Sequence, residues 1–139
     1  MPANVLIVDD SAIMRRMIKR VLAISGLDVG DVFEAGNGIE ALAQMCEHHV
    51  HAVVLDINMP VMNGVKLVER MHDDQRLKDM PVVIVSTEGS DTRIEQLMQA
   101  GAIGYVRKPF RPEQIRAVLA PVLGLKPEAA PAASDESAF

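Results

Sequence analysis

Aromatic residues are scarce in this chain: its 139 residues include three Phe, one Tyr and no Trp. Aliphatic side chains and nine Met must therefore fill the interior, and Met packs adaptably because its side chain is flexible. The chain has a single cysteine, Cys46, which excludes an internal disulfide. Such cysteine usage is typical of proteins from a reducing compartment.

Runs of basic residues and long apolar runs are also absent. The chain carries 14 Lys and Arg against 19 Asp and Glu, a net charge of −5, which argues against a basic surface for nucleic acids. Residues 1–5 enter a strand-like segment without the regions of a signal peptide, and no apolar run approaches membrane-spanning length. We therefore expect a cytoplasmic protein without nucleic-acid or membrane partners.

Length and composition suit one domain followed by a tail. Hydrophobic residues make up 49% of the chain, enough for a core, and the length is usual for one domain. From position 124 the sequence is rich in Ala and Pro and has no apolar period. We expect a domain over residues 1–123 and a disordered tail over residues 124–139.

Short apolar runs alternate with segments of helical period. The runs that predict strands cover residues 5–8, 29–34, 52–55, 81–85 and 102–106. Apart from the weaker run 29–34, they are almost entirely apolar, as expected when both faces of a sheet are covered. Because no hairpin signal is present, five strand–helix units indicate an α/β fold with a parallel sheet between two layers of helices.

The first two helices are predicted from their start and stop residues. Ser11 is a good N-cap for the first helix and Gly26 ends it, while Asn37 and Glu40 resemble a capping box for the second. The apolar residues expected on the inward faces are Met14, Met17, Ile18, Val21 and Leu22, then Ile39, Leu42, Ala43 and Cys46.

The last three helices follow the same pattern. Gly101 ends the fourth helix and Pro112 opens the fifth, whereas Pro121 is expected to end or kink the fifth around residues 117–120. The inward-facing residues predicted in these helices are Leu67, Val68, Met71, Ile94, Leu97, Met98, Ile115, Val118 and Leu119.

Acidic residues directly follow two of the predicted strands. Asp9 and Asp10 come after the first strand, and Asp56 comes after the third. If the strand order is 2-1-3-4-5, these strands are neighbours at the switch point of the sheet and the three carboxylates converge. A hard cation such as Mg²⁺ or Mn²⁺ would relieve their repulsion. The alternative is that each Asp caps a helix or solvates a loop.

The last two predicted strands end in groups suited to a phosphoryl group. Ser86 and Thr87 end the fourth strand, and Lys108 ends the fifth. A hydroxyl and an ammonium beside a metal-bound carboxylate supply the donors and positive charge that phosphoryl transfer needs. Together with the acidic residues, they indicate a phosphoryl-binding site rather than isolated caps and surface charges.

Five short stretches at these positions occur in order over residues 4 to about 123. They are Val8-Asp9-Asp10-Ser11, Leu55 to Pro60, Asn63-Gly64, Val85 to Glu88 and Gly104 to Phe110. The pattern resembles the receiver domain of bacterial response regulators, in particular the single-domain, CheY-like type. The resemblance implies a flavodoxin-like, doubly wound sheet of five parallel strands, in the order 2-1-3-4-5, with five helices.

Carried over position by position, the resemblance implies a phosphorylation site. Asp56 is the expected nucleophile and phospho-acceptor, and Lys108 and Ser86 are expected to contact the phosphoryl oxygens. The expected ligands of Mg²⁺, or alternatively Mn²⁺, are Asp9, Asp10, Asp56 and the backbone carbonyl of Asn58.

The resemblance also implies a switch. The rotamer of Tyr105 is expected to follow Ser86, which stands where Thr is commoner in the family. Asn58 and Glu88 are similar to residues of chemotaxis receivers with a short-lived acyl phosphate, so fast self-dephosphorylation is expected. The Lys108-Pro109 bond resembles the family's cis peptide.

The function implied is that of a stand-alone response regulator. A sensor histidine kinase or a histidine phosphotransfer protein would phosphorylate it, and the phosphoryl group would remodel the face of helix 4, strand 5 and helix 5 for a downstream protein. Chemotaxis and flagellar motor control is the favoured role. The protein would be a monomer that catalyses its own phosphorylation and dephosphorylation and has no separate enzymatic output.

Other functions remain open. One is an intermediate carrier or sink of phosphate in a multistep phosphorelay. Another is a pseudo-receiver scaffold, which should have lost Asp10, Asp56 or Lys108, yet all three are present. A phosphohydrolase would want an Asp-x-Asp motif after the first strand, where Asp9 and Asp10 are adjacent.

The four histidines suggest a surface turn rather than a zinc site. His48, His49 and His51 precede the third strand, and His72 stands apart from them. No cysteine pair and no helical i, i+4 spacing supports zinc ligation.

Overall fold

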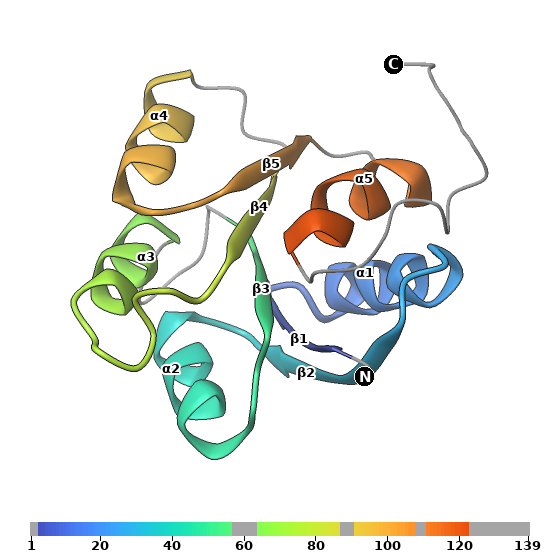
Figure 1. Cartoon of the computed structure of the whole chain (residues 1–139), viewed down its shortest axis with the longest axis horizontal. Coiled ribbons are helices and arrows are strands. Elements are labelled where there is room, and N and C mark those ends of the chain that lie inside the picture. Colours follow the sequence, from blue (N-terminus) through green and yellow to red (C-terminus); the bar gives the residue numbers. More distant parts are fainter. Residues whose placement is uncertain (1–2, 57–63, 87–90, 108–110, 123–139) are drawn as a thin grey trace.

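Strands and helices alternate along the whole described part of the chain (Figure 1). The computed structural model describes residues 3–56, 64–86, 91–107 and 111–122. The elements are β1 (Ala3–Val8), α1 (Ala12–Ile24), β2 (Val29–Ala35), α2 (Gly38–Glu47), β3 (Ala52–Leu55), α3 (Gly64–His72), β4 (Val82–Ser86), α4 (Asp91–Ala100), β5 (Gly104–Arg107) and α5 (Pro112–Val122). The predicted order of five strand–helix units is confirmed. The tail predicted over residues 124–139 lies outside the described residues.

The strands form one parallel sheet in the order β2-β1-β3-β4-β5. This confirms the flavodoxin-like, doubly wound fold. Val8 at the end of β1 pairs with Ala35 at the end of β2 and with Leu55 at the end of β3. The three strands therefore end at the same level. Their carboxyl ends lie beside the switch point between β1 and β3.

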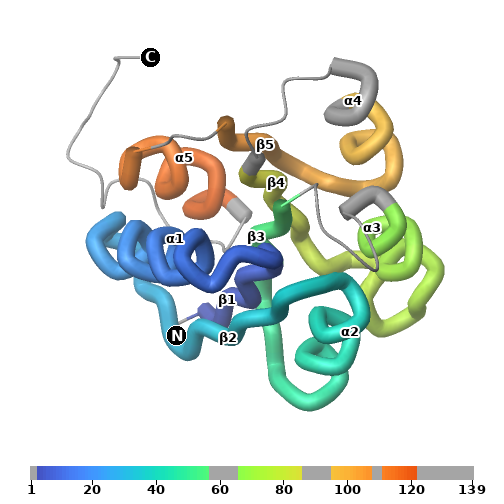
Figure 2. Tube along the Cα trace, turned by 180° about the vertical axis from the view of Figure 1, so that it is seen from behind, coloured from blue at the N-terminus to red at the C-terminus, as the bar shows by residue number. Residues whose placement is uncertain are grey.

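Successive residues of β1 point to opposite faces of the sheet and enter two separate cores. Val5 and Ile7 pack with the residues of α1 and α5, whereas Leu6 and Val8 pack with those of α2, α3 and α4. The two views show this division, with α1 beside α5 on one face and the other three helices on the opposite face (Figure 2). Because both faces are covered, the central strands β1, β3 and β4 are apolar at almost every position, whereas the edge strand β2 carries Asp31 and Glu34.

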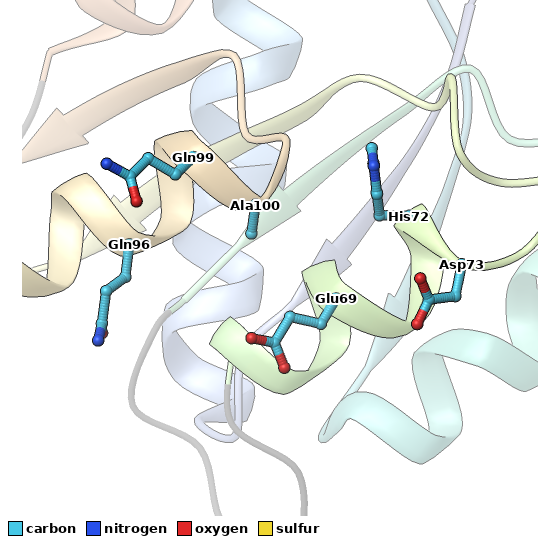
Figure 3. A pocket seen from close by; sticks show the side chains of 6 residues that line it. All are labelled: Glu69, His72, Asp73, Gln96, Gln99 and Ala100. Carbon is cyan, nitrogen blue, oxygen red and sulfur yellow. The ribbon is translucent and has the colours of Figure 1, made fainter.

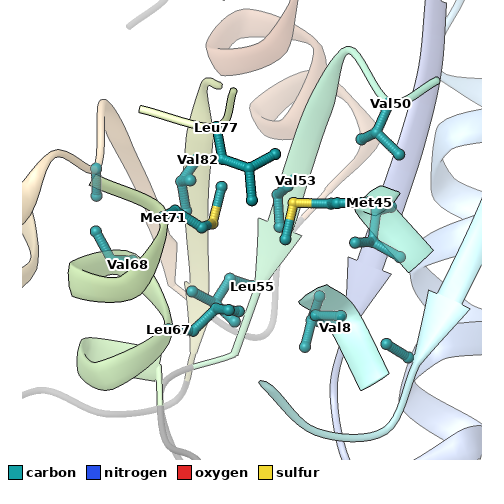
Figure 4. Close-up of a cluster of buried hydrophobic side chains, with 14 of the residues drawn as sticks. Val8, Met45, Val50, Val53, Leu55, Leu67, Val68, Met71, Leu77 and Val82 are labelled. Atoms are coloured by element: carbon teal, nitrogen blue, oxygen red, sulfur yellow. The ribbon is translucent and has the colours of Figure 1, made fainter. Parts of the chain in front are cut away.

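Aliphatic residues fill both cores, as the shortage of aromatic residues requires. Figure 4 shows the core of the α2–α3–α4 face, to which Met also contributes. On the α2–α3–α4 face, Leu55 and Leu67 are fully buried, and Met45 and Met71 fill the space between the helices and the sheet. Burying one such side chain contributes about 1.5–3 kcal/mol. The sheet edge is thus held on both sides by tightly packed elements.

The helix signals near this edge are confirmed with one difference. The Ser11 hydroxyl accepts a hydrogen bond from the Met14 N–H (3.2 Å), and the Asn37 side chain accepts one from the Glu40 N–H (2.9 Å). The Glu40 carboxylate accepts a hydrogen bond from the Gly36 N–H (2.7 Å), one residue before the partner that a capping box requires. The hydrogen bond between the Gly36 N–H and the Glu40 carboxylate therefore anchors the loop after β2.

Several residues predicted to face inward are exposed instead. Met17, Ile39 and Met98 are exposed, and so are Ala43 and Cys46. The buried residues of α2 are Gly38, Ala41 and Met45. Apolar residues surround α2 on most sides, so their spacing alone does not determine which stripe meets the sheet.

The ends of the helices are mostly as predicted. Gly26 and Gly101 follow α1 and α4 with φ values of 87° and 128°, which Gly adopts without strain. The predicted end of α5 around residues 117–120 was wrong, because the helix continues through Pro121 to Val122. Pro121 lies in the last turn, where few further helical hydrogen bonds depend on it. No helix in the described ranges is long and apolar enough to span a bilayer.

Candidate functional site

Backbone hydrogen bonds at the ends of the strands position two acidic residues. The Asp9 N–H donates to the Ala35 carbonyl of β2 (3.1 Å), and the Asp56 N–H donates to the Val8 carbonyl of β1 (2.9 Å). Each bond continues the parallel pairing one step past the end of a strand. The side chains of Asp9 and Asp56 therefore leave the sheet side by side.

Three carboxylates converge at this edge. Asp9, Asp10 and Asp56 each offer one oxygen, and these oxygens all lie within 4.8 Å of one another. Asp9 is buried with 1% of its surface exposed, Asp56 is half-buried and Asp10 is exposed. The buried Asp9 carboxylate accepts a hydrogen bond from the Ser11 N–H (2.9 Å). The convergence predicted from the sequence is confirmed, and we call Asp9, Asp10 and Asp56 the acidic cluster.

The acidic cluster fits a hard divalent cation. Its atoms are oxygens only, and Mg²⁺ prefers oxygen ligands and keeps several bound waters. Water can reach the cluster on the exposed Asp10 side. Charges a few ångströms apart repel one another strongly in a partly buried site, and a cation would turn that repulsion into attraction.

An arginine that the sequence analysis missed contacts the cluster from α1. Arg15 Nη1 donates a hydrogen bond to the backbone carbonyl of Asp9 (2.5 Å), and its Nε donates to Glu34 Oε1 (2.9 Å). No pattern in the sequence separates Arg15 from the other basic residues of α1. Only the packing of α1 beside the end of β2 brings it here.

The remaining predicted site residues are described in part or not at all. Ser86 ends β4 opposite Arg107 of β5, but its side chain is outside the described part of the chain. Tyr105 is half-buried in β5 and packs against the α2–α3–α4 core. Outside the described residues are Asn58, Glu88, Lys108 and Pro109.

Comparison with known proteins identifies the family. Residues 5–120 match the response regulator receiver domain family. The chain belongs to this family. A chemotaxis protein CheY homolog from Campylobacter jejuni is 40% identical over 122 residues, which cover 87% of this chain and 92% of that protein. The receiver domain is thus CheY-like along nearly its whole length.

Solved structures agree with this assignment. Chemotaxis response regulator CheY4 of Vibrio cholerae is 34% identical with a TM-score of 0.79, over 88% of this chain and all of that one. A CheX–CheY complex with BeF3 and Mg²⁺ from Borrelia burgdorferi contains a chain 25% identical to this one. Its TM-score is 0.78, and the match covers 88% of this chain and 90% of that chain.

A cavity of about 440 Å³ lies between α3 and α4, apart from the acidic cluster (Figure 3). It is lined by Glu69, His72, Asp73, Gln96, Gln99 and Ala100. The carboxylates of Glu69 and Asp73 make this cavity unfavourable for a phosphate. None of its lining residues belongs to the acidic cluster, so the cavity is separate from the candidate phosphorylation site.

The histidines before β3 lie at the opposite end of the sheet, on the surface as predicted. His48 stacks on Phe33 with ring centroids 4.1 Å apart, and His49 meets His51 edge-on at 4.6 Å. His51 Nδ1 accepts a hydrogen bond from the Asn4 N–H (2.9 Å). Among the described residues, only the acidic cluster brings together three groups that could hold a metal.

Proposed function

We propose that this receiver domain accepts a phosphoryl group on Asp56, in a reaction that depends on Mg²⁺, and thereby changes its affinity for a partner protein. The observation that supports the proposal is the convergence of Asp9, Asp10 and Asp56 at the carboxyl end of the sheet. The relatives in the receiver family include CheY proteins, and one of them was solved with Mg²⁺.

Differences in exposure favour Asp56 over Asp9 as the acceptor. Asp9 is almost fully buried, and one of its oxygens is occupied by the Ser11 N–H, so little of it can reach a donor. Asp56 is half-buried at the end of β3, next to the switch point, with its backbone held by the Val8 carbonyl. It is close to both neighbouring carboxylates, and part of its surface reaches solvent.

The reaction is an in-line displacement at phosphorus. A carboxylate oxygen of Asp56 forms the new P–O bond while the bond from phosphorus to the donor, a P–N bond in phosphohistidine, breaks. The leaving nitrogen keeps the electron pair. Mg²⁺ held by Asp9, Asp10, Asp56 and the Asn58 carbonyl would neutralise the negative charge gathered at this point.

The other site residues complete the proposal. Lys108 and Ser86 would bind the phosphoryl oxygens, and Asn58 and Glu88 would keep the acyl phosphate short-lived. On phosphorylation, Ser86 would move toward the phosphoryl group, and the Tyr105 side chain would enter the space that Ser86 leaves. The half-buried position of Tyr105 in β5 supports this role, because a side chain between core and surface can move in either direction.

The partners follow from the same proposal. A histidine kinase or a histidine phosphotransfer protein would supply the phosphoryl group, and the α4–β5–α5 face would bind the downstream protein. Met98 of α4 and Ile103, just before β5, are 43% and 48% exposed, so this region offers apolar surface to a partner. The CheY relatives favour chemotaxis as the pathway, with a multistep phosphorelay as the alternative.

The test is phosphorylation by acetyl phosphate and Mg²⁺, followed by intact-protein mass spectrometry. The wild-type protein should gain one phosphoryl group that is stable to acid and labile to base, and Asp56→Ala should gain none. Asp79→Ala, which removes an exposed aspartate from the loop before β4, is the matched control and should be labelled like the wild type.

Two outcomes would count against the proposal. Labelling of Asp56→Ala at the wild-type level would move the acceptor to another residue. A wild-type protein that stays unlabelled with Mg²⁺ would favour the pseudo-receiver alternative.

The same labelled sample reports the lifetime of the acyl phosphate, and a phosphorylated form that persists for hours would contradict the expected fast dephosphorylation.

A further inference from the structure

We propose that Arg15 is a positioning residue for the acidic cluster and acts through the peptide group between Asp9 and Asp10. Its guanidinium joins the Asp9 carbonyl, through Nη1 at 2.5 Å, to the Glu34 carboxylate, through Nε at 2.9 Å. Because Mg²⁺ binding at the cluster belongs to the proposed function, this role rests on that proposal.

The surroundings of Arg15 hold its side chain in one place. Only 18% of the side chain is exposed, and Glu34 is anchored in β2, where it pairs with Ile7 of β1. The planar guanidinium offers several donors in a rigid fork, so two bonds to fixed partners leave it little freedom. Arg15 thus ties the start of α1 and the end of β2 to the turn that carries the cluster.

The bond to the Asp9 carbonyl determines how Asp10 is presented. The Ser11 N–H already donates to the Asp9 carboxylate. Hydrogen bonds therefore fix both the side chain of Asp9, through Ser11, and its backbone carbonyl, through Arg15. Asp10 itself is exposed, and packing does little to direct its carboxylate. Its direction therefore depends on the orientation of the preceding peptide plane. Without Arg15 that peptide can rotate, and Asp10 would turn away from Asp56.

A purely electrostatic role for Arg15 makes the opposite prediction. A guanidinium beside three carboxylates repels an incoming divalent cation, so removal of its charge alone would strengthen Mg²⁺ binding. Loss of positioning would weaken Mg²⁺ binding, because supporting groups outside the ligand shell commonly change metal affinity about 10–100-fold. The sign of the change distinguishes the two roles.

The experiment is a Mg²⁺ titration followed by backbone amide resonances in NMR, at a temperature where each variant is fully folded. Arg15→Met should raise the Kd for Mg²⁺ about tenfold. Arg15→Lys keeps the charge but lacks the fork, so most of the loss should remain. Glu34→Gln keeps Arg15 but weakens its anchor, and a smaller loss is expected.

Arg16→Met is the matched control. It removes the same charge from the next position of α1, which is exposed and points about 100° away around the helix. Its Kd should stay within about twofold of the wild-type value, since it only changes the charge at a distance. An equal loss in Arg15→Met and Arg16→Met would overturn the positioning role, because the loss would then not depend on the bond between Arg15 and the Asp9 carbonyl.

Asp10→Asn separates failure of this role from failure of the proposed function. If Asp10→Asn weakens Mg²⁺ binding while Arg15→Met leaves it unchanged or strengthens it, the positioning role of Arg15 is overturned and the metal site stands. If neither variant changes the Kd, the acidic cluster is not the metal site and the proposed function fails with it.

Discussion

Asp9, Asp10 and Asp56 carry the same carboxylate group in three different environments. Asp9 is buried and bonded to a backbone N–H, Asp56 is half-buried, and Asp10 meets water. A buried carboxylate must be compensated by hydrogen bonds or a cation, whereas an exposed one can exchange partners. The three residues are therefore not equivalent: Asp9 suits the base of a cation site and Asp10 its open side, and Asp56 is the residue that we propose as the phospho-acceptor.

Gly104, the first residue of β5, packs against α5 and gives a test at the residue scale. A Cβ atom on Gly104 would lie 2.7 Å from Val118 Cγ1 of α5, closer than real Cβ contacts allow. Gly104→Ala should therefore lower the free energy of unfolding by about 1–3 kcal/mol through overpacking. Urea unfolding followed by circular dichroism measures the change.

A second substitution checks that the clash is the cause of this loss. Val118→Ala removes the methyl groups that the new side chain would meet, so it should cost less in the Gly104→Ala background than alone. Additive losses in the double variant would mean that Gly104 is needed for another reason, such as its backbone freedom.

At the scale of elements, local side-chain to backbone bonds define the ends of helices and turns. Ser11 and Asn37 cap α1 and α2 through such bonds. After α3, Asp74 does the same for a turn: its carboxylate accepts from the Arg76 N–H (2.8 Å), and its carbonyl accepts from the Lys78 N–H (2.8 Å). These contacts span only a few residues, which is why capping residues are visible in a sequence.

The turn after α3 predicts a dependence of stability on pH. The hydrogen bond from the Arg76 N–H is the main cause that lowers the pKa of Asp74 from its ordinary value of 3.8. A lowered pKa in the folded state means that the stabilising effect of Asp74 is complete above 3.8 and is lost as the pH falls through the folded value. The Asp74→Ala variant should be less stable than the wild type at neutral pH. The difference in the free energy of unfolding should shrink as the pH falls below 3.8.

Urea unfolding of both proteins across this acidic range measures the difference. Asp73→Ala removes the neighbouring exposed carboxylate and reports the effect of charge alone. A loss in Asp74→Ala that is the same at neutral and acidic pH would show that the carboxylate of Asp74 is not responsible.

At the scale of the whole molecule, the site exists only when the sheet is assembled. Asp56 is more than forty residues from Asp9 and Asp10 along the chain, and only the pairing of β1 with β3 brings them together. An unfolded chain therefore lacks the cluster. A cation that binds only the folded state stabilises it by mass action.

Mg²⁺ should consequently protect the protein against unfolding. At a Mg²⁺ concentration one hundred times the Kd, the free energy of unfolding should rise by about 2.7 kcal/mol. Thermal unfolding with MgCl₂, against NaCl at equal ionic strength, measures the effect apart from general screening. The Asp10→Asn variant should lose most of the stabilisation by Mg²⁺. Equal stabilisation by the two salts would argue against a specific site.

The sequence by itself determined the order of strands and helices along the chain, the capping residues and the acidic residues at the strand ends. These signals depend on neighbours a few positions away, so they can be read without knowing what packs against them. The inward stripe of α2 was predicted only in part: Leu42 packs against the core, but Ile39, Ala43 and Cys46 are exposed. Apolar residues surround that helix, and only contact with the sheet selects Ala41 and Met45.

Only the tertiary structure decided the burial of Asp9, the distances within the acidic cluster and the contact of Arg15 with the Asp9 carbonyl. Each depends on strands or helices that meet in space after folding, and many arrangements of a parallel sheet share the same local signals. A sequence can therefore place chemical groups at the ends of strands, but the order and packing of those strands determine which groups touch.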